Sequence, residues 1–342
     1  MGRRWKFERQ DVDRILAHMR KLESARLGQS GKSKARPPTV CFGRPPLRRL
    51  SCLACAFALI ATFGHLSISA ATEIPPAIYA DPAPDPAHPA RMDVLHIPSH
   101  GETINGIAYV AAGAGAHPVV ILLHGLPGNE KNIDLAQAIR RAGWTVVLFN
   151  YRGSWGSPGS FRFGQNLEDA DAVLAYLRDP TNAGALGVDT QRMVIGGHSL
   201  GGWIAINTAA HDKGLIGLFS ISAADMGRLG VAPQPTREKV MSRNMEALAG
   251  VTAASMAADV AIAGPEHPLP KAAPGLVDKS YLAMTADDGI AGDTDALVAA
   301  IRAEGGTRVT TLHLPTDHGW NDRRIALAAT IIVWLEDLIR TH

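Results

Sequence analysis

The sequence predicts an α/β protein with a mostly parallel, doubly wound sheet. Short runs of β-branched and apolar residues alternate with segments whose apolar spacing is typical of helices. One glycine-rich turn stands between such a run and a helical segment, and a long insertion without strand character interrupts the alternation. We therefore expect one sheet flanked by helices, with a helical cap inserted into it.

The expected elements follow from these patterns in chain order. Strands are expected at residues 94–97, 104–110, 119–123, 145–149, 193–195, 215–221, 281–285 and 309–314. Helices are expected at residues 130–142, 167–178, 200–211, 294–304 and 322–339. The alternation favours parallel pairing for most of the sheet, with the first two strands forming an antiparallel edge.

The interrupting segment covers about residues 224–274 and is rich in Ala, Met and Pro. It contains helical stretches at residues 237–249 and 251–262 but no convincing strand. Long insertions in such domains tend to be lids, so we interpret it as a cap over the functional site. A pair of peripheral helices that pack on the body is the alternative.

The first 91 residues differ from the rest in composition. Residues 1–50 carry 14 Lys or Arg and 4 Asp or Glu, and residues 50–71 form an uncharged apolar stretch that ends in small residues. This order is typical of a secretory signal segment, and a retained membrane anchor is the alternative. We expect export to the periplasm or the medium, with translation starting near Val40 and cleavage near Ala71. Residues 72–91 are rich in Pro and Ala and are expected to form an extended linker.

Composition also excludes several functional classes. All three cysteines lie in the first 55 residues, so the folded domain can hold neither a disulfide nor a cysteine-based zinc site. The chain beyond residue 50 is net negative, and nothing in it suggests a nucleic-acid partner. No metal or organic cofactor is expected, because the histidines lack ligand spacing and no glycine-rich phosphate loop precedes a helix. Membrane contact is expected only through the N-terminal apolar segment.

The most informative motif is G-H-S-L-G at residues 197–201, between an expected strand and an expected helix. This is the context of a nucleophile elbow, a tight turn that exposes a serine at the positive end of a helix dipole. Glycine at positions 197 and 201 permits the turn, because a side chain there would collide with the strand or the helix. The motif predicts that Ser199 is a nucleophile.

A nucleophilic serine needs a base and a carboxylate that orients the base. His318 follows the last expected strand, which places it at the same carboxyl edge of the sheet as Ser199. Asp287 and Asp288 end the preceding strand. Asp288 is preferred as the triad acid because apolar residues follow it, and Asp287 is the alternative.

Backbone donors for an oxyanion are expected from two loops. The run H-G-L-P-G at residues 124–128 leaves a buried strand at the same edge. The backbone N–H of Leu126 and that of Leu200 are predicted to form the oxyanion hole. Tyr151 and His198 are expected to contribute to substrate binding.

The order Ser199, Asp288, His318 is that of the α/β-hydrolases, and the chain from about residue 119 onward resembles this superfamily. The runs H-G-L-P-G, N-Y-R-G-S and D-H-G-W-N-D are similar to those of bacterial hydrolases near the prolyl-oligopeptidase and dienelactone-hydrolase branches. The resemblance implies an α/β-hydrolase fold, with residues 92–342 as the catalytic domain. Serine at position 199, where dehalogenases and epoxide hydrolases carry Asp and dienelactone hydrolases carry Cys, implies acyl transfer to water.

The leading hypothesis is an exported serine hydrolase, a carboxylesterase that cleaves small to medium acyl esters through an acyl-enzyme. A peptidase or amidase of the prolyl-oligopeptidase type is the alternative, although the linker is too short for the β-propeller that such peptidases usually carry. A noncatalytic binding scaffold is the third possibility. The presence of a serine, an acid, a histidine and an oxyanion loop, four parts of one mechanism, argues against it. The expected partner is a small ester or a short peptide substrate.

Overall fold

A computed structural model describes residues 74–341 of the chain. The basic region, the expected signal or anchor segment and residues 72–73 of the linker lie outside the described residues. Within residues 74–341, no helix is both long and apolar enough to span a membrane.

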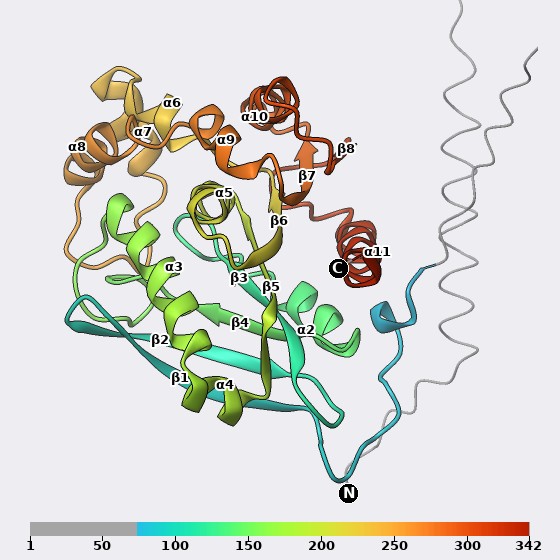
Figure 1. The fold of residues 1–342 in the computed structure, drawn as a ribbon. Coiled ribbons are helices and arrows are strands. Elements are labelled where there is room, and N and C mark those ends of the chain that lie inside the picture. The colour runs from blue at the N-terminus through green and yellow to red at the C-terminus, as the bar shows by residue number, and fades with distance from the viewer. Residues whose placement is uncertain (1–73, 342) are drawn as a thin grey trace, which may run out of the picture. The chain divides into compact units, whose positions relative to one another are not determined.

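One mixed sheet of eight strands runs through the described part of the chain, in the order β1-β2-β4-β3-β5-β6-β7-β8 (Figure 1). The β1–β2 and β2–β4 pairs are antiparallel, and all the other neighbouring pairs are parallel. The predicted parallel sheet with an antiparallel edge is therefore confirmed. The strands are β1 (Arg91–Ser99), β2 (Glu102–Val110), β3 (His117–Leu123), β4 (Thr145–Phe149), β5 (Val188–His198), β6 (Leu215–Ile221), β7 (Ser280–Ala286) and β8 (Val309–Leu314).

Helices connect the strands and cover both faces of the sheet (Figure 1). They are α2 (Ile133–Arg141), α3 (Phe163–Arg178), α4 (Pro180–Leu186), α5 (Leu200–His211), α6 (Met226–Gly230), α7 (Gln234–Met241), α8 (Ala253–Ala263), α9 (Ala273–Leu276), α10 (Ala291–Ala303) and α11 (Arg324–Thr341). Two short 3₁₀ helices are η1 (Pro76–Ile78) and η2 (Leu269–Ala272).

Helix α4 is among the elements that the sequence patterns did not predict. Its N-cap is Asp179, whose carboxylate accepts hydrogen bonds from the amides of Thr181 and Asn182 at 3.0 and 3.1 Å. Pro180 occupies the first helical position, where its missing N–H costs nothing. The Asp-Pro pair was thus the available signal, because Asp is favoured at the N-cap and Pro directly after it.

The sheet separates two apolar cores, which explains why its central strands are apolar throughout. Successive side chains of a strand point to opposite faces. In β3, Ile121 and Leu123 belong to the core beneath α3 and α5, whereas Val120 and Leu122 belong to the core beneath α2 and α11. All four are nearly or fully buried, and burial of such a side chain stabilises the fold by roughly 1.5–3 kcal/mol.

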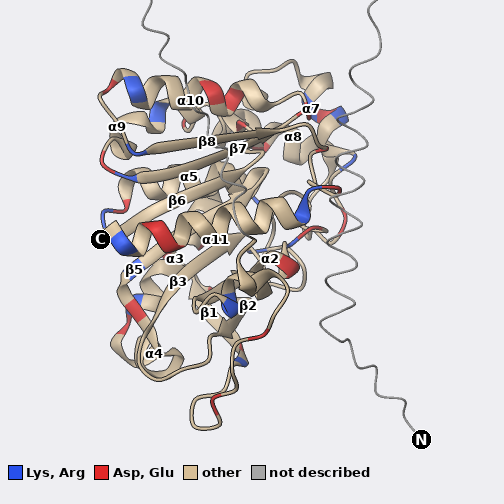
Figure 2. Ribbon diagram, turned by 90° about the vertical axis from the view of Figure 1, so that its right-hand side faces the viewer, with Lys and Arg blue, Asp and Glu red and all other residues tan. Residues whose placement is uncertain are grey.

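The segment between β6 and β7 is a helical insertion, as its composition predicts. Helices α6, α7 and α8 pack together, and the Arg237 side chain joins them by donating to the carbonyl oxygens of Gly230 and Ala257. In Figure 2, α7 and α8 lie at the side of the molecule where α11 begins, which is the carboxyl edge of the parallel strands. The later part of the insertion, η2 and α9, packs into the core beneath α3 and α5 through Leu269 and Leu276.

Part of the expected linker packs on the body of the protein. Pro75 is buried, and Ala77 and Ile78 contact the core beneath α2 and α11. The Arg141 guanidinium donates to the carbonyl oxygen of Ala77 at 2.6 Å. Residues 81–90 form neither helix nor strand, as their Pro content predicts.

Candidate active site

Ser199 lies at the junction of β5 and α5 in a conformation that L-residues rarely adopt, with φ 56° and ψ −118°. The neighbouring glycines make this turn possible. A Cβ atom at Gly197 would lie 2.3 Å from the backbone of Gly201, and one at Gly201 would lie 2.3 Å from the Leu123 carbonyl oxygen. The strained turn lifts Ser199 out of the buried strand, and the residue is half-buried at the N-terminus of α5.

His318 and Asp288 form a hydrogen-bonded pair at the carboxyl ends of β8 and β7. The His318 Nδ1 atom is 2.8 Å from the Asp288 Oδ2 atom. Only 2% of the Asp288 side chain is exposed. Burial alone would raise the pKa of Asp288, but hydrogen bonds from His318, the Ile290 amide and Ser222 outweigh it and hold that pKa below its ordinary value. The carboxylate therefore stays ionised beside the imidazole.

Two residues that the sequence patterns did not single out support this carboxylate. The Ser222 hydroxyl helps to lower the pKa of Asp288, and the indole Nε1 of the fully buried Trp320 donates to the Ser222 Oγ atom at 3.1 Å. Ser222 directly follows β6, the neighbour of β7 in the sheet. The tryptophan in the run D-H-G-W-N-D was the one available signal.

The alternative acid, Asp287, lies in a different environment. Its side chain is 63% exposed and accepts a hydrogen bond from the Nε2 atom of His313 at 3.0 Å. The Asp287 carboxylate therefore contacts His313, whereas the Asp288 carboxylate contacts His318. The structure brings Asp288, the preferred residue, to His318.

The loop after β3 lies directly against Ser199. A Cβ atom at Gly125 would lie 3.1 Å from the Ser199 Cβ atom. Leu126 follows in this loop, and Leu200 is the first residue of α5, where an amide has no acceptor within the helix. The two amides predicted as oxyanion donors therefore belong to the two segments that meet at Ser199.

The imidazole of His318 is also close to the elbow. The His198 and His318 ring centroids are 4.7 Å apart, and the His198 Nε2 atom donates to the His318 carbonyl oxygen at 2.8 Å. Among residues 74–341, Ser199 makes no hydrogen bond to the His318 ring, and such contacts often tighten only when substrate binds. The elbow, the base and the acid thus converge at one edge of the sheet.

A model of the alpha/beta hydrolase family matches residues 120–341 of the chain. The protein is an alpha/beta hydrolase. An uncharacterized protein of Mycobacterium tuberculosis is 31% identical over 122 residues, which are 35% of this chain and 42% of the relative. The quorum-quenching protein AidA of Acinetobacter baumannii is 33% identical over 111 residues, which are 31% of this chain and 35% of that protein. The chain thus spans less than half the length of these curated relatives.

The fold of this alpha/beta hydrolase is shared with solved structures of low sequence identity. A thermostable carboxyl esterase from Bacillus coagulans superimposes with a TM-score of 0.57 at 16% identity. The superposition covers 72% of this chain and 99% of the esterase chain. The predicted superfamily and fold are therefore confirmed, while the branch within the superfamily stays a prediction.

Two residues expected to bind substrate are instead buried behind the site of the hydrolase. Tyr151 is fully buried, and its hydroxyl donates to the His124 carbonyl oxygen at 3.0 Å. His198 is 7% exposed and is engaged with the His318 backbone. The sequence patterns placed both on loops at the correct edge but could not show which way their side chains point. Tyr151 supports the loop that carries Leu126, and His198 supports the loop that carries His318.

Replacing Tyr151 with phenylalanine tests this supporting role. We expect kcat for an ester substrate to fall by roughly 3- to 10-fold, because the lost hydrogen bond holds the loop that carries the predicted oxyanion donor Leu126, while KM stays within about twofold. Steady-state kinetics with p-nitrophenyl acetate measures both constants. A rise in KM at unchanged kcat would restore the original expectation that Tyr151 contacts substrate.

The buried histidines of this hydrolase should make its stability depend on pH. Burial lowers the pKa of His124 and of His198 to about 4, from the ordinary 6.5. Between these values the unfolded chain binds more protons, so the stabilisation is complete above pH 6.5 and is lost as the pH falls toward 4. Over this window we expect the free energy of unfolding to fall by roughly 3 kcal/mol per histidine.

Urea unfolding at pH 7 and pH 4.5 measures this effect. The variant His198→Gln should show a smaller difference between the two pH values than the wild type, because glutamine keeps a donor for the His318 carbonyl but does not titrate. The exposed His96 of β1 provides the matched control, His96→Gln. Equal pH dependence in wild type and His198→Gln would contradict the assignment.

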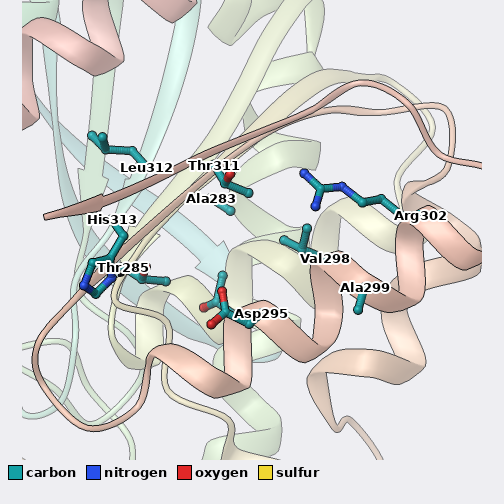
Figure 3. Close-up of a pocket in the computed structure, with 10 residues that line it drawn as sticks. Ala283, Thr285, Asp295, Val298, Ala299, Arg302, Thr311, Leu312 and His313 are labelled. Carbon is teal, nitrogen blue, oxygen red and sulfur yellow. Dashed lines mark hydrogen bonds between the residues drawn. The ribbon is translucent and has the colours of Figure 1, made fainter. Parts of the chain in front are cut away.

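Two surface hollows of the hydrolase lie apart from the elbow. One of about 240 Å³ lies between β7, β8 and α10, where His313 and Arg302 stand at opposite ends and Asp295 lies between them (Figure 3). The other, of about 250 Å³, is lined by residues of α5 and of the later insertion, including His211 and His267. Neither includes Ser199 or His318. Within residues 74–341, no group of three His, Cys, Asp or Glu side chains is placed to hold a metal ion.

Proposed function

We propose that this alpha/beta hydrolase cleaves carboxylic esters through an acyl-enzyme formed on Ser199. The observation that supports it best is the 2.8 Å contact between the His318 imidazole and the buried Asp288 carboxylate, next to a serine on a strained elbow. A buried, ionised carboxylate orients an imidazole and stabilises its charged form, which is what a general base needs in order to accept the serine proton.

The proposed reaction proceeds in two acyl transfers. The Ser199 hydroxyl attacks the acyl carbon while the His318 Nε2 atom accepts its proton, and the Leu126 and Leu200 amides stabilise the oxyanion. The imidazolium then protonates the leaving alkoxide, and the alcohol departs. Water, deprotonated by His318, attacks the acyl-enzyme and releases the acid and the free serine.

Ester rather than peptide hydrolysis is supported by the charged residues of the insertion. A peptidase of the prolyl-oligopeptidase type needs a charged anchor for a peptide terminus. The Asp259 carboxylate instead accepts the Phe163 amide at 2.7 Å, and Glu238 pairs with Gln234 on the same helix. The remaining candidates, Arg243 and Glu246, are exposed. The carboxyl esterase of similar fold is consistent with the same substrate class.

Two measurements on the purified protein test the proposal. Labelling by a fluorophosphonate probe, which reacts with activated serines, separates a serine hydrolase from a noncatalytic scaffold. Hydrolysis of p-nitrophenyl esters of increasing chain length, compared with dipeptide p-nitroanilides, separates an esterase from a peptidase. We expect labelling and ester turnover, with amide turnover at least about a hundredfold slower; absence of labelling would refute the proposal.

We further propose that the hydrolase acts outside the cytoplasm. The support is the sequence alone, a basic flank followed by the apolar stretch at residues 50–71 and its small-residue end. N-terminal sequencing of the protein recovered from the periplasm or medium should begin near Thr72. A protein recovered with residues 50–71 intact in the membrane fraction would favour the anchor instead.

A further inference from the structure

The loop that follows β4 makes hydrogen bonds to residues 124–128, the predicted oxyanion loop, on both sides of Leu126. The Tyr151 hydroxyl donates to the His124 carbonyl oxygen at 3.0 Å, and the Trp155 indole Nε1 donates to the Pro127 carbonyl oxygen at 2.8 Å. His124 precedes and Pro127 follows the residues that carry the predicted donor amide. The Leu126 N–H shares its peptide plane with the Gly125 carbonyl, which accepts a hydrogen bond from the His124 Nδ1 atom at 2.7 Å. The Tyr151 and Trp155 hydrogen bonds fix the carbonyl groups on either side of that plane, so together they restrain the loop that aims the Leu126 N–H.

The Trp155 indole fits closely against this loop. At Gly128, which has φ +103°, an added Cβ atom would lie 2.7 Å from the Trp155 Nε1 atom and 2.6 Å from the His124 Nδ1 atom. The Lys131 Nζ atom lies 4.5 Å from the centroid of the Trp155 ring and donates to the Asn150 Oδ1 atom at 2.7 Å. A cation over an indole face at this distance is attractive, which further restrains the ring.

Backbone contacts with the insertion hold Trp155 itself. Trp155 has φ 47°, an uncommon conformation for a bulky residue, and its N–H donates to the Ala247 carbonyl oxygen at 2.9 Å. Two residues away, the Ala249 N–H donates to the Gly153 carbonyl oxygen at 2.7 Å. Residues 247–249 of the insertion therefore fix the backbone from which the indole reaches the oxyanion loop.

We propose that Trp155 is a positioning residue for the oxyanion hole, and that it connects the placement of insertion residues 247–249 to that of the Leu126 amide. The inference rests on the proposed ester hydrolysis. Removal of a whole oxyanion donor slows turnover by about 10²- to 10³-fold. Loss of the Trp155 hydrogen bond loosens one donor without removing it, so a smaller reduction follows, with substrate affinity little changed.

The variant Trp155→Phe removes the indole N–H and keeps an aromatic ring. We expect kcat for p-nitrophenyl acetate to fall by roughly 5- to 20-fold at a KM within about twofold of wild type. Inhibition by phenylboronic acid, whose serine adduct places an oxygen in the oxyanion hole, should weaken by a similar factor. Trp334→Phe is the matched control. Trp334 lies on α11 and packs against Phe219 of β6, so this variant should leave these constants unchanged.

Titration of active protein with a fluorophosphonate separates the possible outcomes. Suppose that wild type is labelled and that Trp155→Phe keeps both the wild-type kcat, counted per labelled serine, and the wild-type affinity for phenylboronic acid. The inference is then wrong and the proposed function stands. A raised KM at unchanged kcat also overturns it, because Trp155 would then bind substrate. If wild type is neither labelled nor active on esters, the proposed function fails and the inference fails with it.

Discussion

Ser199→Ala should lower ester turnover by about 10⁴- to 10⁶-fold, because the nucleophile, base and acid act as one unit and the remainder retains only binding and oxyanion stabilisation. The substitution removes one hydroxyl from a half-buried position, so the fold and the pH dependence of unfolding should be unchanged. Initial rates with p-nitrophenyl acetate measure the loss. They are taken at several enzyme concentrations, so that the spontaneous hydrolysis of the substrate can be subtracted. Circular dichroism verifies that the variant is folded.

Ser242→Ala is the matched control for this substitution. Ser242 lies at the exposed C-terminal end of α7 in the insertion, and its hydroxyl donates to the Lys239 carbonyl oxygen of the same helix. Its variant should retain full activity and full fluorophosphonate labelling, whereas Ser199→Ala should lose both. Residual turnover above about 1% in Ser199→Ala, with the product formed in proportion to enzyme, would show that another group performs the reaction.

The second large effect is expected from Asp288, the proposed triad acid. Asp288→Asn should lower kcat by about 10³- to 10⁴-fold, because an amide cannot stabilise the imidazolium and can select the wrong tautomer of His318. The near-isosteric change keeps one oxygen that can still accept the Ile290 amide. Substrate affinity should therefore change little, and the loss should appear in kcat.

The adjacent carboxylate provides an unusually direct control. Asp287→Asn alters the same chemical group one residue away, but on a side chain that is 63% exposed and paired with His313. We expect its kcat to lie within about twofold of wild type, in line with small effects at exposed ion pairs. Equal losses in the two variants would mean that the pair acts through the loop as a whole rather than through His318.

Local sequence patterns were sufficient for the parts of the molecule that depend on local sterics. The elbow could be predicted because a strand, two glycines and a helix are contiguous in the chain. Asp288 and His318 could be placed because parallel strands deliver the residues after their carboxyl ends to one edge of the sheet. Family membership and fold agree with that argument.

Side-chain direction and long-range support could not be predicted in the same way. Tyr151 lies on the loop after β4 and His198 ends β5, both at the expected edge of the sheet, yet both side chains turn inward. Their orientation depends on packing between segments distant in sequence. Ser222 and Trp320 meet although 98 residues separate them. The Trp155 contact with Pro127 likewise joins two loops, and neither loop alone carries a pattern that predicts it.

The two ends of the insertion have a consequence for how this enzyme can diversify. Ile221, the last residue of β6, pairs with Met284 of β7, so the chain that leaves for the insertion returns to the strand beside it. Loop-closure entropy rises only with the logarithm of loop length, about 0.6 kcal/mol for each doubling. Changes of length in its exposed loops are thus inexpensive to the fold. An exchange of its helices between relatives would leave the strand ends that carry Ser199, Asp288 and His318 in register, but it must preserve the buried Leu269 and Leu276.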